Sequence, residues 1–261
     1  MTSTPIATSD HTFAVGSLHD RLREAILSGE LPPGAVISQV ELARVYRVGR
    51  TPLREAIRML QREGLIEGEV NRRVRVTPIS VDDLEEIYAL RIVNEALGVR
   101  LTVPQLTTED DTFIERAIQE MDRYSAETEF AMKDQWHRAF HARLVGHAGS
   151  RIVALLRDLR DHTGRYRRAY VQMHNEAWST AVLEHAAIFE AARERDAERA
   201  SVLMARHLAR TALTVMGTLA PDYEPASVRT ATLSVLDSAS SEHVFSGHPP
   251  LGRRRAADAG G

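Results

Sequence analysis

The feature that most constrains the fold is a helical pattern that runs without a strand-like segment from Val81 to about Leu219. Apolar residues recur there every three to four positions, and short turns such as Gly149-Ser150 interrupt them. We expect six helices, near residues 82–102, 108–124, 128–146, 151–171, 176–193 and 196–218. Pro221 ends the pattern. The sequence therefore predicts an all-α bundle over residues 81–220.

Residues 15–78 follow a different plan. Three helical stretches are separated by turns at Ser28-Gly29 and at Val48-Gly49, and a hairpin flanked by β-like residues 65–66 and 74–76 follows them. The third helix opens at Thr51-Pro52, with proline in its first turn. This order in about 65 residues is the plan of a winged helix-turn-helix. The fold class we expect is mainly α, with a winged helix-turn-helix before a helical bundle.

The two ends of the chain lack these patterns. Residues 1–14 are rich in Ser and Thr, and residues 221–261 are rich in Pro, Ser, Gly and Arg. We expect a disordered N-terminus and a largely disordered tail.

The composition excludes several classes of protein. The chain has no cysteine, which rules out disulfide frameworks, thiolate zinc sites and cysteine nucleophiles. Its N-terminus lacks the basic and apolar segments of a signal peptide, and no run approaches the roughly 18 apolar residues of a membrane helix. We expect a soluble, cytoplasmic protein with no membrane partner.

Positive charge gathers in the first module. Residues 11–77 carry 11 arginines against 8 acidic residues, whereas residues 78–261 carry 22 cationic against 27 acidic residues. Within one stretch of the first module lie Arg44, Arg47, Arg50, Arg54 and Arg58, with Glu55 as the single acidic residue among them. An arginine-rich helix face is often only a solvated surface. Its coincidence with a turn, a proline-started helix and a basic hairpin favours DNA binding.

Three of these arginines have positions suited to contact with DNA. Arg50 stands at the start of the third helix, where a guanidinium can bond two guanine acceptors, and Arg54 follows one turn later. Arg44 precedes the turn. The hairpin tip adds Arg72 and Arg73, which would meet the minor groove or the backbone.

Histidines mark the second module. His137 and His141 are one turn apart, and His185 and His207 each lie in the middle of an apolar stripe on another expected helix. A lone core histidine is more often hydrogen-bonded than metal-bound. Histidines on three core-facing stripes favour a divalent metal, because neutral imidazoles that converge on an ion all gain a partner.

Arg91 and Glu95 lie four residues apart on the first helix of the bundle, which is apolar on almost every side. Two interpretations stay open. The pair is either a mutually satisfied buried ion pair, or part of an effector site in which Arg91 presents its planar fork to a carboxylate.

The first module resembles the winged-helix domain of the GntR family of bacterial transcription regulators. The stretch that carries the resemblance is LREAILSGELPPGAVISQVELARVYRVGRTPLREAIRMLQREGLIE, and the match covers nearly all of residues 15–78. The resemblance implies that Arg50, Thr51 and Arg54 contact the operator. Gly49 departs from the usual Ser or Thr, and Arg73 departs from a common glycine in the wing.

The second module resembles the helical effector domain, called FCD, of the FadR subfamily. The segments LRIVNEALGVRL, FHARLVGHAGS and LEHAAIFEAARERDAERASVLMARHL carry this resemblance over about residues 81–218. It implies a divalent metal held by His141, His185 and His207, with His137 in the place of a usual Asp. An all-histidine set favours zinc or nickel. Asp134 lies about 10 Å before His141 along a helix and is not expected to bind. Six helices suit the shorter branch of the subfamily.

Together these features predict a metabolite-responsive transcriptional regulator, a repressor in the usual arrangement of the family. A homodimer would bind a pseudo-palindromic double-stranded operator, and a small carboxylate effector would bind the helical domain. Two alternatives stay open, a metal-dependent enzyme in a helical bundle and a regulator whose metal is purely structural. Against the enzyme, the sequence has no HExxH motif and no glycine-rich phosphate loop.

Overall fold

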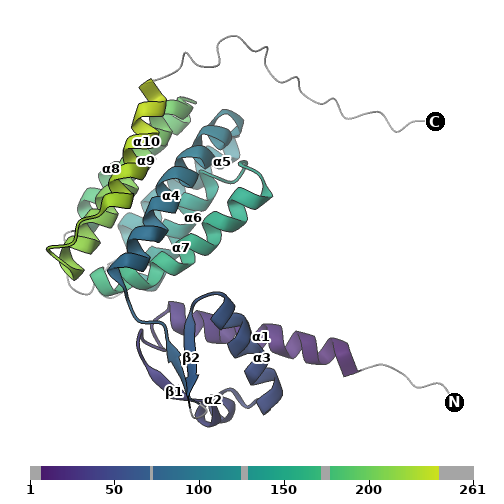
Figure 1. Cartoon of the computed structure of the whole chain (residues 1–261). Coiled ribbons are helices and arrows are strands. Elements are labelled where there is room, and N and C mark those ends of the chain that lie inside the picture. The colour runs from purple at the N-terminus through teal and green to yellow at the C-terminus, as the bar shows by residue number, and fades with distance from the viewer. Residues whose placement is uncertain (1–6, 71–72, 125–128, 172–176, 241–261) are drawn as a thin grey trace, which may run out of the picture.

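The computed structural model describes residues 7–70, 73–124, 129–171 and 177–240. Figure 1 shows two bodies, a small α/β head formed by the first part of the chain and a larger bundle of long helices. A short segment after the last strand of the head leads directly into the bundle. None of the described helices is long and apolar enough to cross a bilayer.

The head contains three helices and a small antiparallel sheet whose strand order is β1-β3-β2. Its elements are α1 (Ala7–Leu27), β1 (Val36–Ser38), α2 (Gln39–Tyr46), α3 (Arg50–Arg62), β2 (Ile66–Val70) and β3 (Arg73–Val76). The core of the head is formed by apolar side chains from every helix and from the last two strands, among them Leu22, Ile26, Leu42, Leu53, Ile57, Leu60, Val74 and Val76. The expected winged helix-turn-helix is confirmed.

The amphipathic third helix of the head explains how this module separates its core from its charged surface. Leu53, Ile57 and Leu60 are spaced four and three residues apart and are fully buried. Arg50 and Arg54 of the same helix are exposed. The hairpin that follows contains a bulge between Glu67 and Glu69, where Gly68 has a φ of +61°.

The bundle contains seven α-helices within the described residues. They are α4 (Val81–Thr102), α5 (Thr108–Arg123), α6 (Phe130–Arg143), α7 (Ser150–Val171), α8 (Ala177–Arg193), α9 (Ala197–Leu219) and α10 (Ala226–Ser240), with a short 3-10 turn η1 (Val103–Gln105) after α4. Helix α4 packs against α7, α9 and α10. Three helices of the bundle therefore pack on α4, but one face of it stays exposed, so its apolar sequence overstated how far the bundle surrounds it.

The expected disorder at the two ends is wrong where the structure describes them. Helix α1 already begins at Ala7, so the Ser and Thr residues before Val15 continue a helix that the buried residues after them anchor. The first half of the tail forms α10, in which Val228, Ala231 and Val235 pack on the bundle core. Residues 1–6 and 241–261 lie outside the described residues.

A specific contact fixes the start of α10. The Glu85 carboxylate on α4 accepts hydrogen bonds from the backbone N–H of Ser227 at 2.6 Å and from the Tyr223 hydroxyl at 2.6 Å. A carboxylate at a helix N-terminus satisfies free N–H groups and favours the helix dipole. The six helices expected between residues 82 and 218 are present as α4 to α9. Helix α10 is a seventh, in a segment whose composition indicated a tail.

Candidate DNA-binding surface and metal centre

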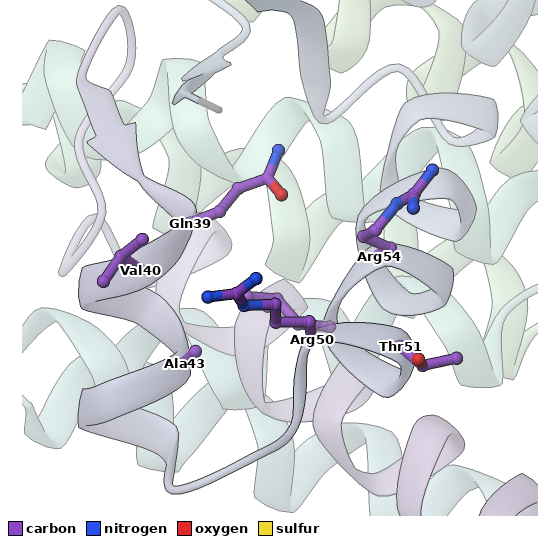
Figure 2. Close-up of a pocket in the computed structure, with 7 residues that line it drawn as sticks. Gln39, Val40, Ala43, Arg50, Thr51 and Arg54 are labelled. Atoms are coloured by element: carbon purple, nitrogen blue, oxygen red, sulfur yellow. The ribbon is translucent and has the colours of Figure 1, made fainter. Parts of the chain in front are cut away.

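Three of the predicted operator contacts line a surface hollow between α2 and α3. Its lining consists of Gln39, Val40, Ala43, Arg50, Thr51, Leu53 and Arg54. Figure 2 shows the Arg50 side chain extending from the start of α3 toward α2, with Arg54 one turn further along α3. Three predicted operator contacts, Arg50, Thr51 and Arg54, therefore lie together on one exposed surface.

The start of α3 is also open to an anion. Gly49 is the N-cap residue and provides no side-chain cap, so no side chain competes for the first N–H groups of the helix. Free N–H groups and the helix dipole bind phosphate well. The replacement of the usual Ser or Thr by Gly49 removes a polar side chain there and leaves the backbone to act alone.

The other predicted DNA contacts are more dispersed. Arg44 is exposed on α2 but does not line the hollow. Arg73 is exposed at the first position of β3. Arg72 lies outside the described residues. Arg58 donates to Glu55 at 2.7 Å on the exposed face of α3, which compensates part of its charge.

The four predicted metal ligands meet in the core of the bundle. One ligand atom from each of His137, His141, His185 and His207 can be chosen so that all four lie within 4.8 Å of one another. Two of these residues come from α6, one from α8 and one from α9. All four are buried, with exposed fractions between 0 and 6%.

Carboxylates orient two of these rings. The Nδ1 atom of His141 lies 3.0 Å from Glu95 Oε2, and the Nδ1 atom of His207 lies 2.7 Å from Glu184 Oε2. Each carboxylate fixes a ring so that Nε2 is the atom left to face the cluster. The Nε2 atoms of His185 and His207 are 3.3 Å apart, and His141 Nε2 has no hydrogen-bond partner among the described residues.

The environment keeps the cluster neutral. Burial lowers the pKa of His141 to about 3, although Glu95 opposes this shift. Burial, together with Arg167 and the neighbouring histidines, holds the pKa of His137 and His185 well below the usual value. Neutral imidazoles are the form that binds metal ions. Four neutral rings converge here, and His141 Nε2 is left without a hydrogen-bond partner among the described residues, an arrangement that fits a divalent ion.

Arg91 and Glu95 form the buried ion pair that one interpretation expected. Arg91 Nε donates to Glu95 Oε1 at 2.7 Å, and the two side chains are 1% and 0% exposed. Burial raises the pKa of Glu95, but Arg91 and His141 outweigh it and hold the pKa below its usual range. Both oxygens of Glu95 are thus engaged, one by Arg91 and one by His141.

Asp134 does not join the histidine cluster, as expected from its distance along α6. Its carboxylate accepts from Arg167 Nη2 at 2.6 Å and lies 3.3 Å from Arg138 Nε. Because Arg167 and Arg138 already neutralise the Asp134 carboxylate, it does not act as a metal ligand.

Sequence reasoning missed a polar face on α7. Arg160, Thr163 and Arg167 are buried and lie three and four residues apart, which places them on one side of the helix. Thr163 Oγ1 accepts from Arg91 Nη1 at 3.1 Å and from Arg167 Nη1 at 3.3 Å. The spacing of these residues was visible in the sequence, but arginines on a helix usually indicate a solvated face.

The same helix also contacts the head. Asp161 on α7 accepts from Arg23 on α1 at 2.9 Å, and Arg23 also donates at 2.9 Å to Glu63, the C-cap residue of α3. Arg165 donates from Nη1 to the carbonyl oxygen of Thr77 at 3.0 Å, in the segment that joins the two bodies. Helix α7 therefore contacts Arg91 through Thr163, the head through Asp161 and the connecting segment through Arg165.

A basic winged helix-turn-helix joined to a helical domain with a buried polar centre defines a DNA-binding transcriptional regulator. Comparison with known families agrees, since residues 15–76 match the bacterial regulatory proteins of the gntR family and residues 86–210 match the FCD domain. The chain belongs to the GntR family and combines its DNA-binding domain with an FCD domain.

Individual relatives support this assignment. An HTH-type transcriptional regulator in an unstable DNA locus of Streptomyces ambofaciens is 30% identical over 72% of this chain and 79% of its own length. The HTH-type transcriptional repressor GlaR of Escherichia coli is 29% identical over 72% of this chain and 89% of its own. A putative GntR regulator from Rhodococcus shares the fold, with a TM-score of 0.68, 23% identity, and coverage of 80% of this chain and 99% of the other. The chain is therefore a regulator, and not the enzyme considered as an alternative.

Proposed function

We propose that the chain is a metabolite-responsive repressor of the FadR subfamily that senses a small carboxylate through a metal centre in its helical domain. The observation that carries this proposal is the convergence of His137, His141, His185 and His207 in the bundle core. GlaR, which matches 72% of this chain, is named as a repressor, and this supports repression here. A DNA-binding repressor acts in the cytoplasm of a bacterium.

The four histidines would hold a divalent ion, with zinc or nickel favoured because every donor is an imidazole nitrogen. A bound ion supplies positive charge and a coordination position that a carboxylate can take. Glu95 and Glu184 orient His141 and His207 for this task. We assign Glu95 to that orienting role, since both of its oxygens are already engaged.

Arg91 remains the candidate for contact with the effector. Its Nη2 atom is buried and has no hydrogen-bond partner among the described residues, although Nε and Nη1 are both engaged. A buried guanidinium N–H without an acceptor is costly unless a ligand provides one. A carboxylate beside the histidine centre would provide it.

We propose a homodimer whose interface includes the outer face of α4. Leu90, Val93, Leu97 and Leu101 lie three to four residues apart on that helix and are 41–50% exposed. A contiguous exposed apolar stripe indicates a protein interface, and a second copy would bury the same stripe on both sides. Because α4 follows directly from the head, such a dimer would hold two heads at one spacing on a pseudo-palindromic operator.

Sedimentation analysis tests this dimer. Leu97→Glu should convert the dimer to a monomer at micromolar concentration, whereas Leu183→Glu, at a separate exposed position on α8, should not. A monomeric wild-type protein, or a dimeric Leu97→Glu variant, would exclude the α4 interface.

The effector signal would reach the head through α7. This helix contacts Arg91 through Thr163 and contacts Arg23 of the head through Asp161. A ligand that shifts the polar face of α7 would change the relative placement of the two heads and so lower operator affinity.

Native mass spectrometry and elemental analysis of one purified sample test the central proposal. We expect one metal ion per chain, and His141→Ala should lose both the metal and the effector response. A protein that takes up none of zinc, nickel or manganese would exclude the metal centre. A variant that loses the metal and thermal stability but keeps its effector response would show a structural metal instead.

A further inference from the structure

A second buried arginine lies beside Arg91 without a role in the site described above. Arg160 on α7 is 4% exposed, and its Nη1 atom has no acceptor among the described residues. Burial lowers the pKa of Arg160, Arg91 lowers it further, and Glu95 opposes the change. Arg91 and Arg160 meet at Thr163, whose hydroxyl accepts from Arg91 Nη1 at 3.1 Å and donates to the Arg160 carbonyl oxygen at 2.9 Å. Each arginine has one buried guanidinium nitrogen without an acceptor among the described residues.

The charges around the histidine centre do not balance. Among the described residues, Arg91, Arg160 and Arg167 lie near the carboxylates of Glu95, Asp134 and Asp161. Both oxygens of Glu95 are engaged by Arg91 and His141, and Asp161 accepts from Arg23 and Arg138. The Arg167 guanidinium donates from Nε and Nη2 to Asp134 and from Nη1 to Thr163. The excess positive charge therefore belongs to Arg91 and Arg160. A buried positive charge without a partner is destabilising, and an anionic ligand removes that cost.

We infer that Arg91 and Arg160 form an anion-binding subsite, and that the effector is a dicarboxylate. This inference rests on the proposed carboxylate-sensing function. One carboxylate of the ligand would lie at the histidine centre, and the second would accept from Arg91 Nη2 and Arg160 Nη1. A planar carboxylate has two oxygens and so matches two guanidinium donors. A monocarboxylate would leave either the histidine centre or the arginine pair without an anion.

Isothermal titration calorimetry of the metal-loaded full-length chain tests this inference with matched acids. The probes are malonate, succinate and glutarate, each with its monocarboxylate of equal chain length (propionate, butyrate and valerate), and inorganic phosphate. At least one dicarboxylate should bind about 10-fold or more tightly than its partner. Arg160→Gln should weaken that dicarboxylate about 10- to 100-fold and its monocarboxylate partner less than about 3-fold.

Arg157→Gln is the matched control, since Arg157 lies one turn earlier on α7 and is exposed. It should leave all affinities unchanged. Arg160→Lys keeps the charge but loses the planar fork, so it should give an intermediate affinity.

Thermal unfolding of the metal-free variants separates this role from a structural one. Removing an unpaired buried charge should leave the Tm of Arg160→Gln equal to or above that of the wild type. A fall of more than about 5 °C would instead make Arg160 a structural residue and overturn the inference.

Other outcomes separate the two levels of the proposal. Equal binding of dicarboxylates and monocarboxylates, with equal losses in Arg160→Gln, would overturn the dicarboxylate subsite and leave carboxylate sensing in place. Binding of phosphate alone, with the same dependence on Arg160, would overturn the ligand class. If the wild type binds none of the probes while it still binds operator and metal, the sensing proposal fails as well.

Discussion

The two domains use arginine in opposite ways. In the head, Arg44, Arg50, Arg54 and Arg73 are exposed, whereas in the bundle Arg91, Arg160, Arg165 and Arg167 are 1–5% exposed. Exposed guanidinium groups attract a polyanion from a distance and keep their own hydration until it binds. Buried guanidinium groups lose their hydration when the chain folds, so each needs a fixed acceptor from the protein or from a ligand.

The comparison predicts different responses to the loss of a partner. A buried arginine is sensitive to the removal of a single acceptor, because no water can replace it. An exposed arginine affects the folded state little and changes DNA affinity instead. Variants that remove one partner at a time therefore test whether buried and exposed arginines differ in this way.

The largest effect on stability is expected for Glu95→Gln. The variant removes the negative charge that faces Arg91 and leaves one acceptor oxygen where Arg91 and His141 now have two, both in the bundle core. Breaking a buried ion pair typically lowers the free energy of unfolding by about 3–5 kcal/mol. Urea unfolding of the metal-free protein measures the loss.

Glu198→Gln is the control for this measurement, since Glu198 pairs with Arg100 at a partly exposed position. We expect a change within about 1 kcal/mol there. Equal losses in the two variants would mean that burial does not distinguish the arginines of this protein.

The next effect concerns operator affinity. Arg50→Ala should weaken operator binding about 10- to 100-fold per contacted half-site, as expected for a bidentate contact with guanine worth about 1–3 kcal/mol. Its melting temperature should stay close to that of the wild type, because Arg50 is exposed. Fluorescence anisotropy with a DNA fragment selected from a random library measures this loss.

Arg62→Ala provides the comparison on the same helix, at its last, exposed position away from the hollow. It should change operator affinity less than about 3-fold. An Arg50→Ala protein that binds operator as tightly as wild type would show that α3 does not enter the groove by its N-terminal end.

Periodicity explains why so much of the bundle was predictable. An apolar stripe repeats along each helix, and each stripe must face the common core, so histidines in the middle of the stripes had to approach one another. His137, His141, His185 and His207 were found in this way and lie together in the structure. The start of α3 was predictable for a local reason, the turn before it and Pro52 in its first turn.

Tertiary contacts explain what the sequence did not reveal. Helix α10 depends on Glu85, which lies more than 140 residues before Ser227. The buried polar face of α7 depends on Arg91 and Asp134, which belong to two other helices. A single helix of the same sequence would expose Arg160 to water, and only the assembled bundle buries it.

Asp161→Asn should have a smaller effect, and one that appears only in the coupling between the domains. Asp161 joins the buried face of α7 to the exposed head through Arg23. The variant should retain operator and metal binding. The coupling between ligand and operator is expected to be about 1–3 kcal/mol in the wild type, and the variant should reduce the ligand-induced change in operator affinity several-fold. Operator affinity of the zinc-loaded protein with and without succinate measures the difference.

Asp158→Asn, one turn earlier on α7 and exposed, should keep the full response. If Asp161→Asn also keeps it, the signal crosses the domain boundary elsewhere, and the contact with Arg23 only holds the head in place.

The smallest effect is expected in the wing. Arg73 is exposed at the start of β3, opposite Ser38 of β1 and Val70 of β2, and we expect it to contact phosphate. Arg73→Ala should weaken binding of every DNA sequence by a similar factor, about 3- to 10-fold at low salt, and lower the salt slope by about one. Arg75→Ala is its control on the same face of β3, where Glu67 lies 3.6 Å from the guanidinium. If the loss of affinity in Arg73→Ala depends on the DNA sequence, the wing reads bases. Exposure alone would then not distinguish arginines that contact phosphate from arginines that contact bases.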